Sequence, residues 1–228
     1  MSHITRGQLV ADTREYMDAV GSSRWSDAII KTVLTSVFDS EWSNILNAAP
    51  YYTFQQLTVA TDANGQVPFA SLSTGSGDTQ KNFYRVLSVS DGNVLYTQTR
   101  FQDVPLATTT NYLPSYPRMY YVAGDALQAL PVGSNTSLVI AVNYKPTSIN
   151  DLSSDNASID FPDNAHLILV WEAASQLLLK GGTEATAAAN LRQLASADRQ
   201  TLLDDIRRRT IMPTMMAYPD QKYDWAGG

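Results

Sequence analysis

The sequence predicts an α+β protein, in which helices at both ends of the chain flank a central run of β-strands. Apolar residues recur with the helical period before Pro50 and again after about residue 160. Between these regions, short runs rich in Val, Tyr, Phe and Thr alternate with turn residues. The chain has 228 residues and is 44% hydrophobic, which is enough for a sizeable core. We therefore expect a helical bundle from residues 1–50 and 160–209, an inserted antiparallel β-domain at 51–159 and an extended C-terminal tail at 210–228.

Two helices are expected near the N-terminus. Apolar residues share one helical face from Thr5 to Val20, and Gly21 ends that pattern. Ser26 is a suitable N-cap for a longer second helix, which keeps its period until Pro50 stops it. About 23 residues at 1.5 Å each would make this helix a rod of roughly 35 Å.

Two further helices are expected after the strands. Asp163 is the predicted N-cap of the first, Gly181-Gly182 breaks it, and Thr183 can cap the second. Because the break is short, we expect an antiparallel αα-hairpin. Three tryptophans fall on or beside apolar helical faces and are expected in the core: Trp25, Trp42 and Trp171.

The middle of the chain contains strand-like runs separated by Gly, Asn, Asp and Ser. Residues 120–131, YYVAGDALQALP, predict two strands joined by a tight turn at Gly124-Asp125. Residues 62–82 offer little to bury, so we expect an extended hairpin with a mobile Gly/Ser-rich tip. The other runs are YTFQQLTVAT at 52–61, FYRVLSV at 83–89, GNVLYT at 92–97 and SLVIAVNY at 137–144.

Composition argues against several classes of protein. Cysteine is absent, so there is no disulfide framework, no thiol nucleophile and no cysteine metal site. The net charge of −6 argues against tight non-specific binding of nucleic acid, which needs basic surface. The N-terminus is polar and unlike a signal peptide, and no apolar run is long enough to span a bilayer, so no membrane partner is expected.

Motifs for catalysis or cofactor binding are missing. The two histidines, His3 and His166, belong to no metal or nucleophile motif. Residues 151–162 begin like a calcium loop, but Asn156 stands where the turn glycine belongs and Pro162 where the bidentate glutamate belongs. We therefore expect no catalytic residue, no cofactor and no metal.

The charged residues of the helices have simple interpretations. Glu41 and the adjacent Asp204 and Asp205 are expected on solvated helix faces, since neighbouring residues on a helix point about 100° apart. A basic run ends the last helix, where it suits the helix dipole; the alternative is a contact to an acidic partner or to the DNA backbone. The run consists of Arg207, Arg208 and Arg209.

The order of these elements resembles the head-to-tail adaptor (connector) proteins of tailed bacteriophages. The resemblance is carried by residues 23–46, 118–131 and 137–182, and it covers most of Arg6 to Arg209. The sequence departs from that family at residues 62–82 and 106–117.

The resemblance implies a structural virion protein located in the neck between capsid and tail, and in the host cytoplasm during assembly. Adaptors form a ring, typically of twelve copies, beneath the portal protein, with a tail or nozzle/stopper protein on the opposite side. DNA passes through the lumen without sequence-specific binding. The helical part would form the ring wall, Asp125 would be a turn residue, and the C-terminal tail would be a portal-docking arm. Its expected contact residues are Met212, Met215, Met216, Tyr218, Tyr223 and Trp225.

Other functions stay open at this stage. Another phage neck or tail-completion protein would share these patterns. A ligand- or carbohydrate-binding β module would need an exposed aromatic platform, for which FYRV at 83–86 or RMYY at 118–121 are candidates. A hydrolase would use Glu41 together with Asp39.

Overall fold

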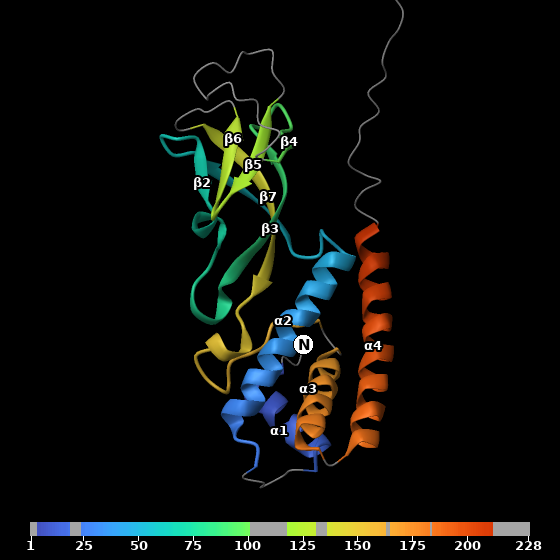
Figure 1. Cartoon of the computed structure of the whole chain (residues 1–228). Helices are drawn as coiled ribbons and strands as arrows, with labels where there is room; N and C mark the ends of the chain where they lie inside the picture. The colour runs from blue at the N-terminus through green and yellow to red at the C-terminus, as the bar shows by residue number, and fades with distance from the viewer. Residues whose placement is uncertain are drawn as a thin grey trace, which may run out of the picture.

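The computed structural model describes residues 4–18, 24–100, 118–130, 136–162, 165–182 and 184–211. Within these ranges the chain forms four α-helices and two β-sheets, which confirms the α+β class. Figure 1 shows the helices packed together at one end of the molecule and the two sheets at the other. Among the described residues, no helix has the length and apolar character needed to cross a membrane.

The first two helices begin at side-chain caps. In α1 (Arg6–Tyr16), Thr5 Oγ1 accepts from the Gln8 backbone N–H, and Gln8 Oε1 accepts from the Thr5 N–H at 2.8 Å. In α2 (Asp27–Ala48), the Ser26 hydroxyl accepts from the Ile29 N–H, so the predicted N-cap is confirmed. α1 is shorter than expected, and the predicted stop at Gly21 lies outside the described residues.

The last two helices, α3 (His166–Gly181) and α4 (Ala185–Ile211), lie side by side in Figure 1. The break after Gly181 is confirmed, since Gly182 has a φ of 71°, which favours glycine. The predicted cap at Asp163 is wrong, because the N-cap of α3 is Ala165 and it has no side-chain cap. Asp163 itself and Thr183 lie outside the described residues. α4 continues two residues past the expected end at Arg209.

The four helices share one hydrophobic core. Trp42 is buried in it, while Trp25 and Trp171 pack against it from the edge, as predicted. The apolar period of α2 arises because that helix turns one face to this core along its whole length. Large side chains of the core include Leu9, Ile30, Leu34, Phe38, Ile45, Leu46, Leu169, Val170 and Leu177.

The strands form two sheets. The first has the order β1 (Phe54–Ala60), β7 (Ser137–Pro146), β3 (Lys81–Ser90); the second has the order β2 (Gln66–Pro68), β6 (Ala126–Leu130), β5 (Met119–Ala123), β4 (Thr97–Gln98). The predicted hairpin is confirmed: β5 and β6 pair up to Ala123 and Ala126, which leaves Gly124 and Asp125 as the turn. The expectation of a purely antiparallel β part is wrong, because β4 pairs in parallel with β5. The GNVLYT run is mostly turn, and only its last residue enters β4.

A second core fills the space between the sheets. Val67 and Leu72 are fully buried in it, so the expectation that residues 62–82 have little to bury is wrong. The segment is held because β2 pairs with β6 and is followed by the short 3-10 helix Phe69–Leu72. The other buried side chains of this core include Val89, Tyr96, Tyr120, Leu127, Leu138, Ile140, Val142 and Tyr144.

Candidate functional site

A buried ion cluster joins α2, α3 and α4. Glu41 is only 3% exposed, and its carboxylate accepts hydrogen bonds from Arg199, whose Nη2 lies 2.6 Å from Oε1. Glu172 on α3 lies 3.4 Å from the same guanidinium. The hydrogen bonds to Glu41 raise the pKa of Arg199 above its ordinary value. The expectation of a solvated Glu41 is therefore wrong, and the cluster acts as a cross-link between helices.

The same geometry bears on the hydrolase hypothesis. Both carboxylate oxygens of Glu41 accept from Arg199, so Glu41 is held as an ion-pair partner rather than as a general base. Asp39, two residues earlier on α2, is exposed, and such neighbours do not face each other on a helix. Partial burial raises the pKa of Asp39, but this carboxylate does not join the Glu41 cluster.

The polar connector after β7 is clamped to the N-terminal helices. Asp155 Oδ1 accepts from Arg6 Nε at 2.8 Å and lies 2.7 Å from Lys31 Nζ. These two hydrogen bonds hold the pKa of Asp155 below its ordinary value. Gly7 packs so closely here that an added Cβ would lie 3.1 Å from the Asp155 carbonyl oxygen. Asp155, which belongs to the segment that resembles a calcium loop, is thus bound by two cationic side chains.

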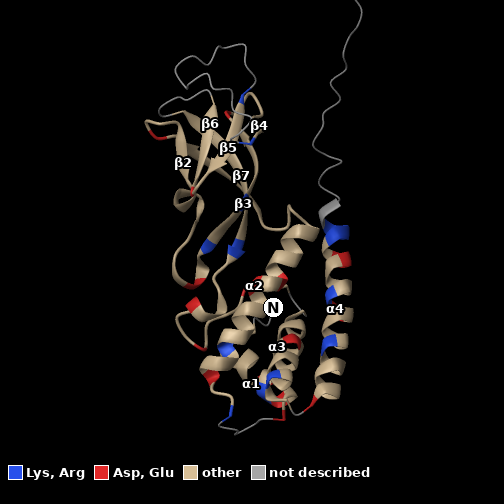
Figure 2. Ribbon diagram, in the orientation of Figure 1, with Lys and Arg blue, Asp and Glu red and all other residues tan. Residues whose placement is uncertain are grey.

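The C-terminal end of α4 carries paired charges. Arg209 lies 2.6 Å from Asp205, and Arg207 lies 3.4 Å from Asp204, all with about half or more of their side chains exposed. The solvated position predicted for the two aspartates is confirmed. Arg208 is exposed and has no ion-pair partner among the described residues. Figure 2 shows that charged residues are concentrated on the helices and at their junction with the strands.

The residues expected in the docking arm lie beyond this helix end. All six fall outside the described residues: Met212, Met215, Met216, Tyr218, Tyr223 and Trp225. The structure therefore places their point of attachment, Ile211 at the end of α4, and not the residues themselves.

An exposed aromatic patch, which the sequence reasoning missed, lies where α2 passes into β1. Tyr51 is 58% exposed and Phe54 is 43% exposed, with their rings 6.1 Å apart. Tyr52 packs against Trp42 of the helical core at 6.1 Å and anchors the patch. The signal for it was present: residues 51–61 contain three aromatics and no charged residue. Exposed aromatic clusters of this kind mark interaction sites.

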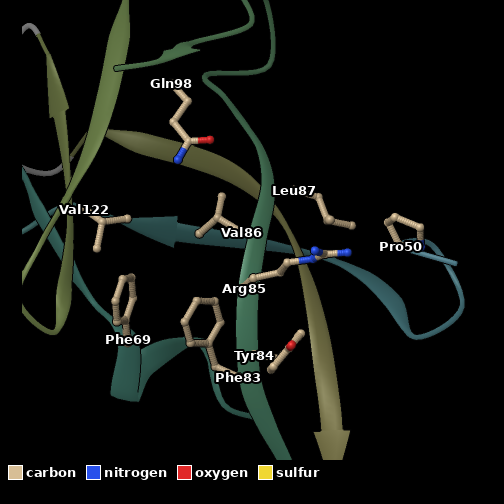
Figure 3. A pocket seen from close by; sticks show the side chains of 9 residues that line it. All are labelled: Pro50, Phe69, Phe83, Tyr84, Arg85, Val86, Leu87, Gln98 and Val122. Atoms are coloured by element: carbon tan, nitrogen blue, oxygen red, sulfur yellow. The ribbon is translucent and has the colours of Figure 1, made fainter. Parts of the chain in front are cut away.

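A groove of about 540 Å³ follows the opposite edge of the same sheet, along β3. Figure 3 shows its lining residues on both sides of β3: Phe69, Phe83 and Val122 on one side, Leu87 and Pro50 on the other. Two irregularities in the pairing of β3 with β7, after Phe83 and after Val86, bend the strand here. The rings of Phe69 and Phe83 stack at 4.6 Å and form an apolar wall.

The aromatic residues of the two runs suggested as platforms make several internal contacts, although the FYRV residues also line the groove along β3. Tyr120 of the RMYY run is buried in the second core. In the FYRV run, Phe83 stacks on Phe69, and Lys145 lies 4.6 Å from the ring centre of Tyr84. Arg85 binds to α2, since its Nη2 donates a hydrogen bond to the Leu46 carbonyl at 2.7 Å. The FYRV run therefore forms part of a groove rather than a flat aromatic platform.

Comparison with known families identifies a match that covers most of the chain. The sequence model of the family described as SU10 adaptor protein matches residues 4–217, which is most of the chain. No curated protein is significantly similar in sequence.

Proposed function

The chain belongs to the SU10 adaptor protein family, a phage head-to-tail adaptor family, and on this premise we propose that it forms a ring beneath the portal vertex. The family makes it a structural protein of the virion, implies a non-enzymatic role, and implies interaction with portal and tail proteins. The ring, its copy number and its position under the portal are the proposal. The match over residues 4–217 is the observation that carries it.

In this proposal the helical part, residues 1–50 and 160–209, forms the ring wall, and the β part at 51–159 projects toward the tail or nozzle/stopper protein. The buried ion cluster and the clamp at Asp155 support such a role, because they fix all four helices and the connector as one unit. A rigid subunit loses little further conformational entropy when it assembles. Twelve copies are proposed, to match the ring expected of adaptors.

The charge of the chain supports a passage for DNA. At −6 per chain, twelve copies would carry a formal charge of −72. A ring with that net charge disfavours binding of the phosphate backbone. We propose that DNA passes through the ring without sequence-specific contacts, and that the assembled ring resides in the virion neck after assembly in the host cytoplasm.

We propose further that the C-terminal segment docks on the portal. The 17 residues after Ile211 could reach about 56 Å at 3.3 Å each when extended. Their methionines and aromatics suit an adaptable apolar groove on a partner. The family match ends at residue 217, so Tyr218, Tyr223 and Trp225 lie beyond it. Arg208, which points to solvent near this end, suits an acidic portal surface.

The test is a truncation after Ile211, which keeps α4 intact. We expect unchanged helicity by circular dichroism and loss of portal binding in a pull-down, whereas the variant Trp225→Ala in the full chain should weaken binding partially. Arg208→Ala in the full chain measures the contribution of the exposed arginine. Full portal binding by the truncated chain would contradict the arm. Binding of the full chain to a tail protein but never to the portal would favour another neck or tail-completion role.

A further inference from the structure

The outer edge of β1 is a regular strand edge with unpaired backbone groups. Thr61 N–H donates to the Thr136 carbonyl at 3.0 Å, which fixes every second residue of β1 as facing β7. The residues between them face outward. Apart from the Phe54 N–H, which donates to the Tyr51 carbonyl at 3.3 Å, their N–H and C=O groups have no hydrogen-bond partner among the described residues. These outward residues are Phe54, Gln56, Thr58 and Ala60.

This edge lacks the features that normally prevent strands from associating. Protected edges carry charges, prolines or bulges. β1 has none of these: its pairing with β7 is continuous, and residues 51–61 contain no charged residue and no proline. Leu57 and Val59 pack against the second core but stay partly exposed, because no described strand covers that side. An added strand would complete their burial.

The opposite edge of the same sheet is different. On β3, Lys81 N–H donates to Thr74 O, Phe83 N–H donates to Ser73 Oγ, and Val89 O accepts from Tyr96 N–H. The two pairing irregularities interrupt the alternation of inward and outward residues between Phe83 and Val89. Val86 is then the outward-facing position of this stretch that has no backbone partner among the described residues. Val86 lies on the groove described above. One edge of the sheet is thus an uncharged strand, and the other borders a groove lined mainly by apolar and aromatic side chains.

We propose that the β1 edge of one copy seats in the β3 groove of the next copy, where Val86 offers the open backbone position, so that the first sheets of neighbouring subunits meet edge to edge around the ring. Head-to-tail rings need two different surfaces on each copy, and these two lie on opposite edges of one sheet. β1 and β3 are both antiparallel to β7, so they run in the same direction and would meet as parallel strands. This inference rests on the proposed ring and names its subunit contact.

The contact is too small to hold two free copies together. A seven-residue strand is about 23 Å long, so the strip buries on the order of 700 Å² in total, below the roughly 1,000 Å² of stable interfaces. Two free copies should therefore associate weakly, and the contact forms when a portal holds many copies together. Three strands per copy at about 4.8 Å spacing, repeated twelve times, would surround an opening about 55 Å across.

Proline scanning of the edge tests the backbone contact. Thr58→Pro removes an outward N–H without touching the ladder to β7, whereas Thr58→Ala keeps the N–H and removes the same side-chain atoms. We expect Thr58→Pro to reduce the copies bound per portal at least tenfold relative to Thr58→Ala at equal protein concentration. Complete rings with Thr58→Pro would overturn the inference. If Thr58→Pro fails to form rings but single copies still bind the portal through the C-terminal segment, the proposed adaptor role is retained.

Cross-linking tests the identity of the occupant. The chain has no cysteine, so Gln56→Cys on β1 and Gln98→Cys in the groove introduce single thiols. We expect a dimer-sized disulfide product when the two variants are mixed and assembled on portals, and none from either variant alone. A product from Gln56→Cys alone would show a symmetric β1–β1 contact, and a product with portal or tail protein would show that another chain occupies the edge. Either result, or no product in assembled necks, would overturn the inference.

Discussion

Replacing Arg199 by methionine should leave a buried carboxylate without its cation. Glu41 is 3% exposed and takes its closest ion-pair contact, 2.6 Å, from Arg199. Removing one partner of a buried ion pair costs about 3–5 kcal/mol. The Arg199 side chain keeps 26% of its surface exposed, so water can reach the cluster, and we expect the lower limit, about 3 kcal/mol. For a chain of this size that loss lowers the Tm by about 6–12 °C.

The assay is urea unfolding followed by tryptophan fluorescence. Trp25, Trp42 and Trp171 all pack on or against the helical core, so their signal reports the part that contains the cluster. The double variant Glu41→Leu/Arg199→Met removes both charges of the closest ion pair and should recover most of the lost stability, because the carboxylate left without its cation is then Glu172, whose side chain is 19% exposed. A loss under about 1 kcal/mol in Arg199→Met, or a double variant no more stable than the single one, would refute the reasoning.

Three further predictions follow from the same contacts. Gly124→Ala should cost about 1 kcal/mol in urea unfolding, because Gly124 has a φ of 61°, whereas Asp125→Asn should leave folding and assembly unchanged; a loss of assembly in folded Asp125→Asn would contradict the turn role. The folded-state pKa of Asp155 is lowered. Its carboxylate therefore contributes fully to stability at pH values above the ordinary aspartate pKa of about 3.9, and this contribution is lost as the pH falls through the folded-state pKa. Thermal melts between pH 5 and 2 should therefore fall less steeply in Asp155→Asn than in the wild type, and identical slopes would count against the clamp. Trp171→Ala should cost about 3 kcal/mol by circular dichroism, since its ring packs at the core edge and meets Tyr16 at 6.1 Å; a change within 0.5 kcal/mol would place Trp171 outside the core.

The helices were predictable because their signals are local. Ser26 and the period of α2 lie within one segment, and the glycine after Gly181 ends α3 through its own backbone conformation. The hairpin at Gly124-Asp125 was predictable for the same reason. The error at Asp163 is also local: a residue suited to capping stood near the helix start, but α3 begins later, at His166.

Features that depend on distant residues could not be predicted. Glu41 looked like a surface carboxylate because its partner, Arg199, lies 158 positions away in the chain. The burial of Val67 and Leu72 depends on a second sheet whose β6 lies some 60 residues further along. The β3 groove likewise becomes visible only when Phe69, Phe83 and Val122, which lie far apart in the chain, are brought together. The resemblance to phage adaptors rested on the order of elements, and the match over residues 4–217 confirms the family.

The most direct test of the adaptor role is the mass of the chain with and without the portal protein. Native mass spectrometry of the purified chain should give a monomer or weak oligomer near 25.0 kDa per copy. After addition of assembled portals it should give a complex containing a full ring of adaptor, with twelve copies as the expected number. A complex with the portal that contains one or a few copies at saturating protein, or no complex at all, would contradict the account.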